Sequence, residues 1–484
     1  MSISGTISSS LSGLTAASRA AELVSTNIAN AMTPGYGRRE IALTSRQIGA
    51  VGNGVEVIGV KRVTNLIAIN ERRHSDATLG QASARAAYYR KLESTIGVPD
   101  STASLTARVA TFDASLLSAA SRPDSEAKLS EVANAARAIA TQIAAASKEI
   151  QAGRRRAEEQ IVRDVELLNS TLARISDLNT QIRALAIGSD SSTLQDQRQQ
   201  AIDSITAIVP LREVARDGGT VALVTLTGGV LLDGPVATIE FGASGVITPE
   251  MTLESGALSP LILNGNAVST GAANASLAGG RLAANFAIRD EIGVQAQAKL
   301  DAIARDLVER FQDPAVDPTL APGAAGLFTD AGVAFEPANE VGLSGRLRLN
   351  ALVDPQQGGE LWRLRDGIGA AAPGLSSDAT LLGAMQSALN ALREPASGDF
   401  MPGTRTFSEL IGEHISTLTA QRLGAESDES FAIGTSDALI TTELGEGVDT
   451  DTELQKLLLI EQVYTANAKV MQTIDDLLKT LLGM

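Results

Sequence analysis

The chain contains 484 residues, which at about 150 residues per domain predicts roughly three domains. Hydrophobic residues make up 44% of the chain but aromatic residues only 3%, so aliphatic side chains must fill the core, as suits closely packed helices. Forty Lys and Arg against 56 Asp and Glu give a formal charge of −16. An acidic surface repels phosphate, which excludes nucleic acid and disfavours anionic membranes as partners.

Residues that could support catalysis are few. Cysteine is absent, which excludes disulfides and thiolate metal sites. Of the two histidines, we expect His74 on a solvated helix surface and His414 on the polar side of an amphipathic helix. There is no HExxH motif, phosphate-binding glycine loop or nucleophile elbow. We therefore expect a protein that is not an enzyme and has no catalytic residues, no cofactor and no metal.

Signals for membranes and secretion are also missing. No run of 18 apolar residues occurs, so we expect no membrane-spanning segment. The first 24 residues lack the basic and continuous apolar regions of a cleavable secretory signal.

The N-terminal segment has the pattern of a helix that pairs with another helix. Large apolar residues follow spacings of three and four, with Ser10 as a polar slot and Leu11 beside it. Small residues elsewhere would let a second helix approach closely. The pattern stops at Asn30, and the segment from Thr33 to Gly35 breaks the helix.

The middle of the chain predicts one long helix followed by a β-rich insert. Residues 124–187 contain no proline, and a helix of that length would span about 95 Å. We expect Arg154 to Arg156 on its solvated face, beside Glu158 and Glu159. No Lys or Arg occurs in residues 218–280, where residues 220–227 and 230–232 predict a hairpin.

The segments after the insert alternate between helix and loop patterns. Helices are expected at 285–312, 378–392 and 406–423, a strand at 344–353, and a linker or polar surface at 424–455.

The last helix has an unusually wide apolar face. One stripe begins at Leu457, and a second row of Val463, Val470 and Leu477 lies beside it. Such a face is wider than a two-stranded seam needs and indicates burial against more than one neighbour. Two interpretations remain open: the terminal helices pack into the core of a monomer, which is the commoner arrangement, or neighbouring subunits complete them.

These patterns predict an α+β, mainly α chain in three parts. Paired coiled-coil helices at the two ends form a terminal part, 1–35 plus 452–484. An elongated, mostly helical part with some strands covers 36–209 plus 285–451. A small β-rich insert covers 210–284.

Short motifs at both ends resemble the bacterial flagellar axial protein family. Its ANxxTPGY signature is matched by Asn30, Thr33, Pro34, Gly35 and Tyr36. The segment 52–57, GNGVEV, is similar to a strand of that family, and residues 447–473 resemble its C-terminal helix. In the interior, ISDLNTQI at 175–182 and LQDQR at 194–198 resemble the hook-associated branch of the family.

The resemblance implies a structural role at the junction between the flagellar hook and filament, needed for filament assembly; the alternative is a hook or distal-rod subunit. It implies export through the flagellar secretion channel without a cleaved signal, to an extracellular location in the flagellum. The implied partners are further copies of the chain in a ring, the hook protein, a second junction protein on the filament side, the export apparatus and a chaperone that binds the C-terminal helix.

The resemblance also implies that the terminal helices form an inner tube. From their stripes we expect these residues to pack between subunits: Ile3, Ile7, Leu11, Leu14, Val24, Ile28, Leu457, Ile460, Tyr464, Met471, Ile474, Leu478 and Leu481.

Overall fold

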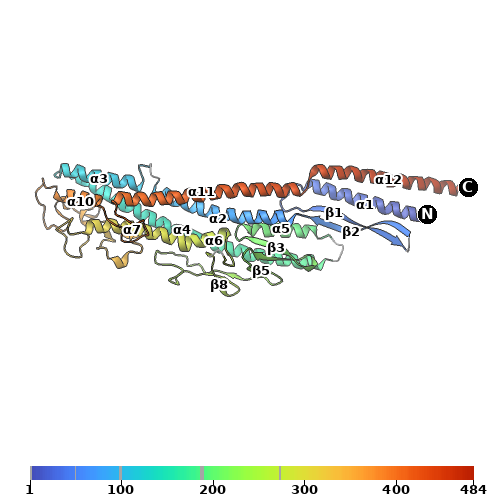
Figure 1. Ribbon diagram of the computed structural model, residues 1–484, viewed down its shortest axis with the longest axis horizontal. Coiled ribbons are helices and arrows are strands. Elements are labelled where there is room, and N and C mark those ends of the chain that lie inside the picture. Colours follow the sequence, from blue (N-terminus) through green and yellow to red (C-terminus); the bar gives the residue numbers. More distant parts are fainter. Residues whose placement is uncertain (1–2, 49–50, 98–100, 186–189, 272–273, 484) are drawn as a thin grey trace.

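The molecule is long and narrow, and its two termini lie at the same end (Figure 1). The computed structural model describes residues 3–48, 51–97, 101–185, 190–271 and 274–483. Helices α2 (Leu66–Ile96), α4 (Glu126–Ala184) and α11 (Phe407–Glu446) run along a thick body. Helices α1 (Ile3–Ala29) and α12 (Thr450–Leu482) extend beyond it as a thin rod. The predicted mainly α, α+β class is confirmed.

The long helix α4 forms the spine of the body, close to the predicted limits. Gly153 lies inside it because the ring of Tyr88 packs there: a Cβ on Gly153 would come within 2.7 Å of that ring. The prediction that the arginines beside it face solvent is wrong for Arg154. Its guanidinium is buried and donates to the carbonyls of Arg289 at 2.8 Å and Thr248 at 3.1 Å, because other segments cover this face of α4.

The segment that was expected to be β-rich forms two small antiparallel sheets against α4 and α5 (Ser192–Thr206). One contains β3 (Leu211–Ala215), β4 (Val221–Thr225) and β5 (Val230–Leu232); the other contains β6 (Ile239–Glu240), β7 (Leu261–Leu263) and β8 (Asn266–Val268). The β4–β5 hairpin is confirmed. Leu168, Ile202 and Leu223 are fully buried together, so the first sheet shares one core with both helices.

Short helices close the end of the body that lies far from the termini (Figure 1). They are α3 (Leu105–Ser121), α7 (Gly293–Gln312), α9 (Arg363–Asp366) and α10 (Thr380–Asn390). Two short strands, β9 (Phe328–Asp330) and β10 (Leu347–Leu349), pair beside them. Helix α6 (Gly280–Ala287) lies in the middle of the body against α2 and α4, and the π-helical turn η2 (Ile288–Ile292) joins it to α7. Single 3-10 turns are η1 (Asp217–Gly219), η3 (Pro337–Asn339), η4 (Ala351–Val353) and η5 (Pro355–Gln357).

The strand expected at 344–353 is wrong over most of its length. The segment begins in the helical turn α8 (Leu343–Arg346), and only β10 is extended. Asp301 explains the turn, because its carboxylate accepts the backbone N–H of Gly342 at 2.8 Å and of Ser344 at 2.9 Å. A carboxylate at the start of a helical turn satisfies amides that have no partner within the helix.

Of the two alternatives for 424–455, the linker is wrong, since α11 continues to Glu446 and α12 starts at Thr450. The segment is helical, and most of its residues are not buried, as the polar-surface alternative expects. The reason for the helix is tertiary. One side of α11 packs along α2, where Ala425, Ala432 and Ser436 are buried. Arg90 of α2 adds an ion pair of 2.7 Å to Glu429. Packing against a neighbour stabilises a helix whose own sequence pattern is weak.

Candidate subunit interface

The terminal rod consists of α1, α12 and the hairpin of β1 (Arg38–Ile48) and β2 (Val51–Val63). Figure 1 shows α1 and α12 running antiparallel beside each other, with the hairpin along α1. Asn27 meets Glu453 near the body, and Gly13 meets Asn467 further out. The rod therefore brings the two ends of the chain together.

The seam between α1 and α12 is lined by small residues of α1. Ser10, Ala17, Val24 and Asn27 are buried, and they repeat with the spacing of a helix-pairing row. A Cβ on Gly13 would lie only 3.0 Å from the side chain of Asn467, so the two helices approach closely there. Ser10, Ala17 and Val24 belong to the stripe predicted for α1. The larger members of that stripe, Ile3, Ile7, Leu14 and Ile28, are not buried in the isolated chain.

The expected packing residues of α1 consequently differ in exposure. Ile3 is 41% and Leu11 56% exposed, Ile7, Leu14 and Ile28 are half-buried, and Val24 is buried within the chain.

On α12, Ile474 is buried within the chain and Tyr464 is 48% exposed. Leu457, Ile460, Met471 and Leu478 are half-buried, and the side chain of Leu481 lies outside those that the structure describes.

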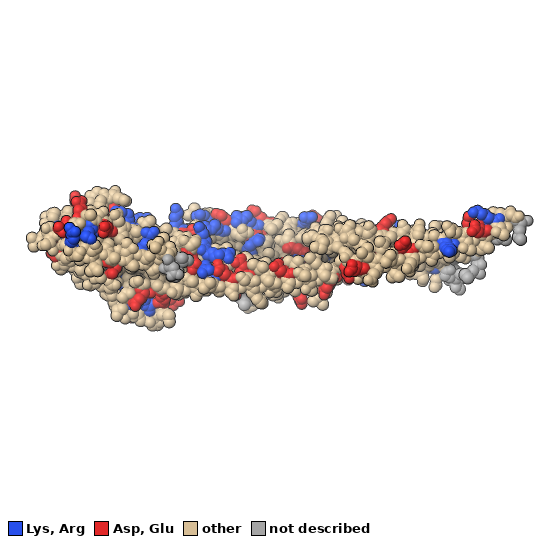
Figure 2. All heavy atoms as spheres, turned by 90° about the horizontal axis from the view of Figure 1, so that it is seen from above, with Lys and Arg blue, Asp and Glu red and all other residues tan. Residues whose placement is uncertain are grey.

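The second apolar row of α12 has no cover in the isolated chain. Leu459, Val463, Val470 and Leu477 are between 40% and 60% exposed. Charged side chains are sparse on the face of the rod that Figure 2 shows, compared with the body. Contiguous apolar surface of this kind marks sites of protein association.

A groove of about 400 Å³ lies at the foot of this row, between α1, α12 and the hairpin. Gly13, Ala16 and Ala17 line it on the α1 side, and Leu43 and Val463 line it on the others. Because its lining is apolar and small, the groove can receive an apolar side chain from another molecule.

Asn27 ties the rod together where it meets the body. Its amide donates to Glu453 at 2.8 Å and to the carbonyl of Arg39 at 2.9 Å, and its oxygen accepts the hydroxyl of Tyr36 at 2.8 Å. Burial alone would raise the pKa of Glu453, but hydrogen bonds from Asn27 and Lys456 outweigh it, so the pKa is lowered. The charged carboxylate therefore stays favourable in this buried place.

Residues of the family motif form the turn that leads out of α1. Asn30 donates its side-chain amide to the carbonyl of Thr26 at 2.9 Å, and Thr33 donates its backbone N–H to Asn30 at 2.9 Å. Gly35 has a φ of +76°, and a Cβ there would lie 2.7 Å from Gln200. Glycine is required at this position because a side chain would be strained and would also clash.

The turn docks onto α5, and we call this contact the joint. Asp196 of α5 accepts the backbone N–H of Gly37 at 3.0 Å and pairs with Arg62 at 2.7 Å and Arg39 at 3.1 Å. Arg62 also donates to the carbonyl of Gly35 at 3.1 Å. Asp196 lies in the LQDQR segment that the sequence analysis singled out, and it binds the turn that contains the ANxxTPGY motif. One carboxylate thus fixes the orientation of the rod.

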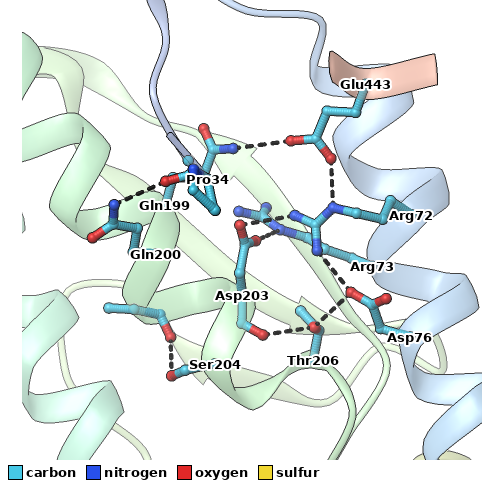
Figure 3. Close-up of polar contacts among 12 residues, drawn as sticks. Pro34, Arg72, Arg73, Asp76, Gln199, Gln200, Asp203, Ser204, Thr206 and Glu443 are labelled. Atoms are coloured by element: carbon cyan, nitrogen blue, oxygen red, sulfur yellow. Dashed lines mark hydrogen bonds and ion pairs between the residues drawn. The ribbon is translucent and has the colours of Figure 1, made fainter. Parts of the chain in front are cut away.

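A second ionic cluster, drawn in Figure 3, locks α2, α5, β3 and α11 beside the joint. Arg72 contacts Asp203 at 2.8 Å and Glu443 at 2.5 Å, and Arg73 contacts Asp203 at 2.7 Å and Glu213 at 2.9 Å. Burial alone would lower the pKa of Arg72, but the carboxylates outweigh it and raise the pKa. Arg73 is fully buried.

Sequence reasoning missed this cluster because it placed the segment before His74 on a solvated surface. His74 is exposed, as expected, but the acids that bury Arg73 lie at least 130 positions away, and no local pattern reports them. Over the described parts of the chain, no group of three His, Asp or Glu is placed to hold a metal. Within the same parts, no helix is long and apolar enough to cross a membrane.

Comparison with known proteins gives consistent matches. The family model described as the flagellar hook-associated protein FlgK helical domain matches residues 89–314. The model described as the flagellar basal body rod FlgEFG protein C-terminal region matches residues 445–484.

Several relatives carry the name flagellar hook-associated protein 1. That of Salmonella typhimurium is 27% identical over 286 residues, which are 54% of this chain and 51% of the relative. In this alignment the chain spans about half the length of the relative. That of Bacillus subtilis is 23% identical over 506 residues, covering 97% of this chain and 96% of the relative.

A solved structure of the flagellar hook junction protein FlgK from Burkholderia pseudomallei is similar to 54% of this chain and 47% of its own, at 20% identity and a TM-score of 0.41.

Proposed function

We propose that this chain is a structural component of the bacterial flagellum, because two flagellar family models match it and several of its relatives are flagellar hook-associated protein 1. In this proposal it joins the hook to the filament and is needed for filament assembly. It acts as a building block, in keeping with a family of structural proteins, and catalyses no reaction.

The observation that carries the proposal is the uncovered apolar row on the rod. Val463, Val470 and Leu477 are about half exposed, although α12 already pairs with α1. Fully burying such a side chain is worth about 1.5–3 kcal/mol, so covering the remaining half contributes about 1 kcal/mol each. A second copy placed against this face would gain that energy at every contact of a ring.

The three parts of the chain would then occupy different radii of the assembly. Residues 1–35 and 452–484 would form the inner tube, residues 36–209 and 285–451 the layer outside it, and residues 210–284 the outermost part. Figure 1 supports a separate position for the rod, which extends from one end. The strands β3 to β8 lie along the side of the body, nearer to the rod than α3 and α10, so the outermost position of residues 210–284 rests on the family resemblance alone. The subunit contacts would use the half-exposed residues of α1 and α12.

The partners that we propose follow from the proposed position of the chain between the hook and the filament. Along the axis, the chain would contact the hook protein on one side and a second junction protein on the other. It would be exported without a cleaved signal through the flagellar secretion channel and come to lie outside the cell. Before export, the apolar face of α12 would suit a chaperone, because an uncovered apolar helix face risks aggregation.

One observation favours a second candidate, a hook or distal-rod subunit. The C-terminal residues 445–484 match a model named after basal-body rod proteins. The helical-domain match over 89–314 favours the junction instead.

Electron microscopy of cells that lack this gene, together with an assay of flagellin in the medium, separates the two candidates. Complete hooks without filaments, with flagellin lost to the medium, are expected for a junction protein. Rods without hooks would support the second candidate, and normal filaments would refute both.

A further inference from the structure

A cavity of about 420 Å³ lies inside the body between α2, α7, α11 and the loop 391–406. Tyr89, Leu92 and Leu418 line it with apolar surface, and Lys299 and His414 bring basic nitrogen atoms to it. Its size lies within the range of cavities that hold small organic molecules. The cavity is far from the rod and takes no part in the proposed assembly contacts.

His414 is a buried polar side chain without a partner. It was expected on the polar side of its helix, which is wrong: only 5% of it is exposed, because this end of α11 packs against the rest of the body. Its Nε2 atom has no hydrogen-bond partner among the described residues. Leaving a buried polar atom unpaired is costly, and such atoms commonly have a ligand, an ion or a water as partner.

Lys299 adds an uncompensated positive charge to the same cavity. Burial, and after it the positive charge of Lys299, together lower the pKa of His414 to about 4, and both side chains line the cavity. Lys299 lies 5.9 Å from the ring centre of Phe400, and no carboxylate within the described ranges forms an ion pair with it. Without an anion between them, the positive charge of Lys299 disfavours the protonated form of the imidazole.

The other titratable groups around the cavity do not supply this anion. Tyr89 is neutral, since burial raises the pKa of its hydroxyl. Asp399 is exposed on the loop, where water screens its charge. Gly398 next to it has a φ of +91°, and a Cβ there would lie 2.5 Å from the Cβ of Ala302. The glycine therefore lets the loop lie closely over α7 at the cavity.

We propose that the cavity binds a small organic monocarboxylate, with its carboxylate between Lys299 and His414 and its apolar body against Leu92 and Leu418. The carboxylate supplies the missing counter-charge of Lys299 and accepts a hydrogen bond from an N–H of the imidazole, which the neutral ring already carries. A bound anion beside the ring also stabilises its protonated form, so binding favours uptake of a proton by His414. Affinity must rise as the pH falls, because proton uptake and ligand binding are linked.

The presence of only two histidines makes this proposal testable by NMR. In the full chain labelled with ¹³C-histidine, hexanoate is titrated at pH 7.5 and pH 5.5, with hexan-1-ol as the neutral probe of equal length. We expect hexanoate to move the His414 signal and leave that of exposed His74 in place. The affinity should be higher at pH 5.5 than at pH 7.5, and hexan-1-ol should bind much more weakly.

A matched pair of lysine variants tests the anchor. Lys299→Met should weaken hexanoate binding at least tenfold, whereas Lys148→Met, at an exposed position outside the cavity lining, should bind like the parent chain. The proposal is overturned if hexanoate does not move the His414 signal, if hexan-1-ol acts equally well, or if both variants bind like the parent. If Lys299→Met fails to fold, the comparison of hexanoate with hexan-1-ol on the parent chain still decides.

Discussion

Replacing Val463 by Asp is expected to block assembly while the isolated chain stays folded. Val463 is 52% exposed, so in the isolated chain the new carboxylate reaches water, and such surface changes cost at most about 0.5 kcal/mol. In an assembly that covers α12, the same change forfeits about 1 kcal/mol of burial and leaves a charge without a partner, which costs several kcal/mol more. A total of about 4 kcal/mol corresponds to a roughly thousandfold weaker contact.

Two measurements check this prediction. Circular dichroism gives the melting temperature of the purified chain, and electron microscopy gives the number of filaments on cells that carry the variant. Val463→Thr is the matched control, since it keeps the shape without a charge and should assemble far better. Leu300→Ala, at a fully buried position of the body, should lower the stability by about 2–5 kcal/mol and shows that the melt reports the fold. The reasoning would be refuted by normal filaments with Val463→Asp, or by a melting temperature lowered as far as that of Leu300→Ala.

Three further outcomes are expected. Asp196→Ala removes the carboxylate that binds Arg39, Arg62 and the amide of Gly37, so the free energy of unfolding should fall by about 2–4 kcal/mol. Asp177→Ala, at an exposed position of α4, is the control, and equal melts of the two variants would contradict the joint. The pKa of His414 is lowered from 6.5 to about 4, so the unfolded chain binds the proton more readily than the folded chain. About 3 kcal/mol of stability should therefore be lost as the pH falls from 6.5 to 4. In His414→Leu that part of the pH dependence should vanish, and an unchanged profile would contradict the prediction. The small residues of the α1–α12 seam bury little apolar surface, so amide exchange in the isolated chain should be fast in α1 and α12 and slow in α4; strong protection of the rod would contradict its dependence on neighbouring copies.

The sequence predicted elements that depend on local patterns. The helix α4 followed from a long stretch without proline and with apolar residues on one face, and the β4–β5 hairpin from turn residues between two apolar runs. The helices at both ends of the chain were predicted for the same reason. The stripe of α1 was predicted as well, with Ser10 in it, but the sequence pattern did not show that its small members would be buried while Ile3 and Leu11 stay exposed.

The joint shows what local patterns leave open. Both of its halves stood out in the sequence, the motif near Gly35 and the segment around Asp196, yet nothing in either predicts that they bind each other. The same holds for Arg73 and His414, each of which lies in a polar stretch of sequence. A side chain is buried when elements from elsewhere in the chain cover it, and the covering elements are distant in sequence.

What the sequence determined by itself is the kind of molecule: a mainly helical chain whose ends are apolar helices, with family motifs that the comparisons support. The spacing of apolar residues and the amino-acid composition are properties of the sequence itself, so they can be determined without the three-dimensional structure. Tertiary structure alone decided that pairing with α1 leaves one apolar row of α12 about half exposed, and that His414 and Lys299 share one cavity. Those facts depend on which distant surfaces meet, because burial and the pairing of charges are set by contacts across the fold.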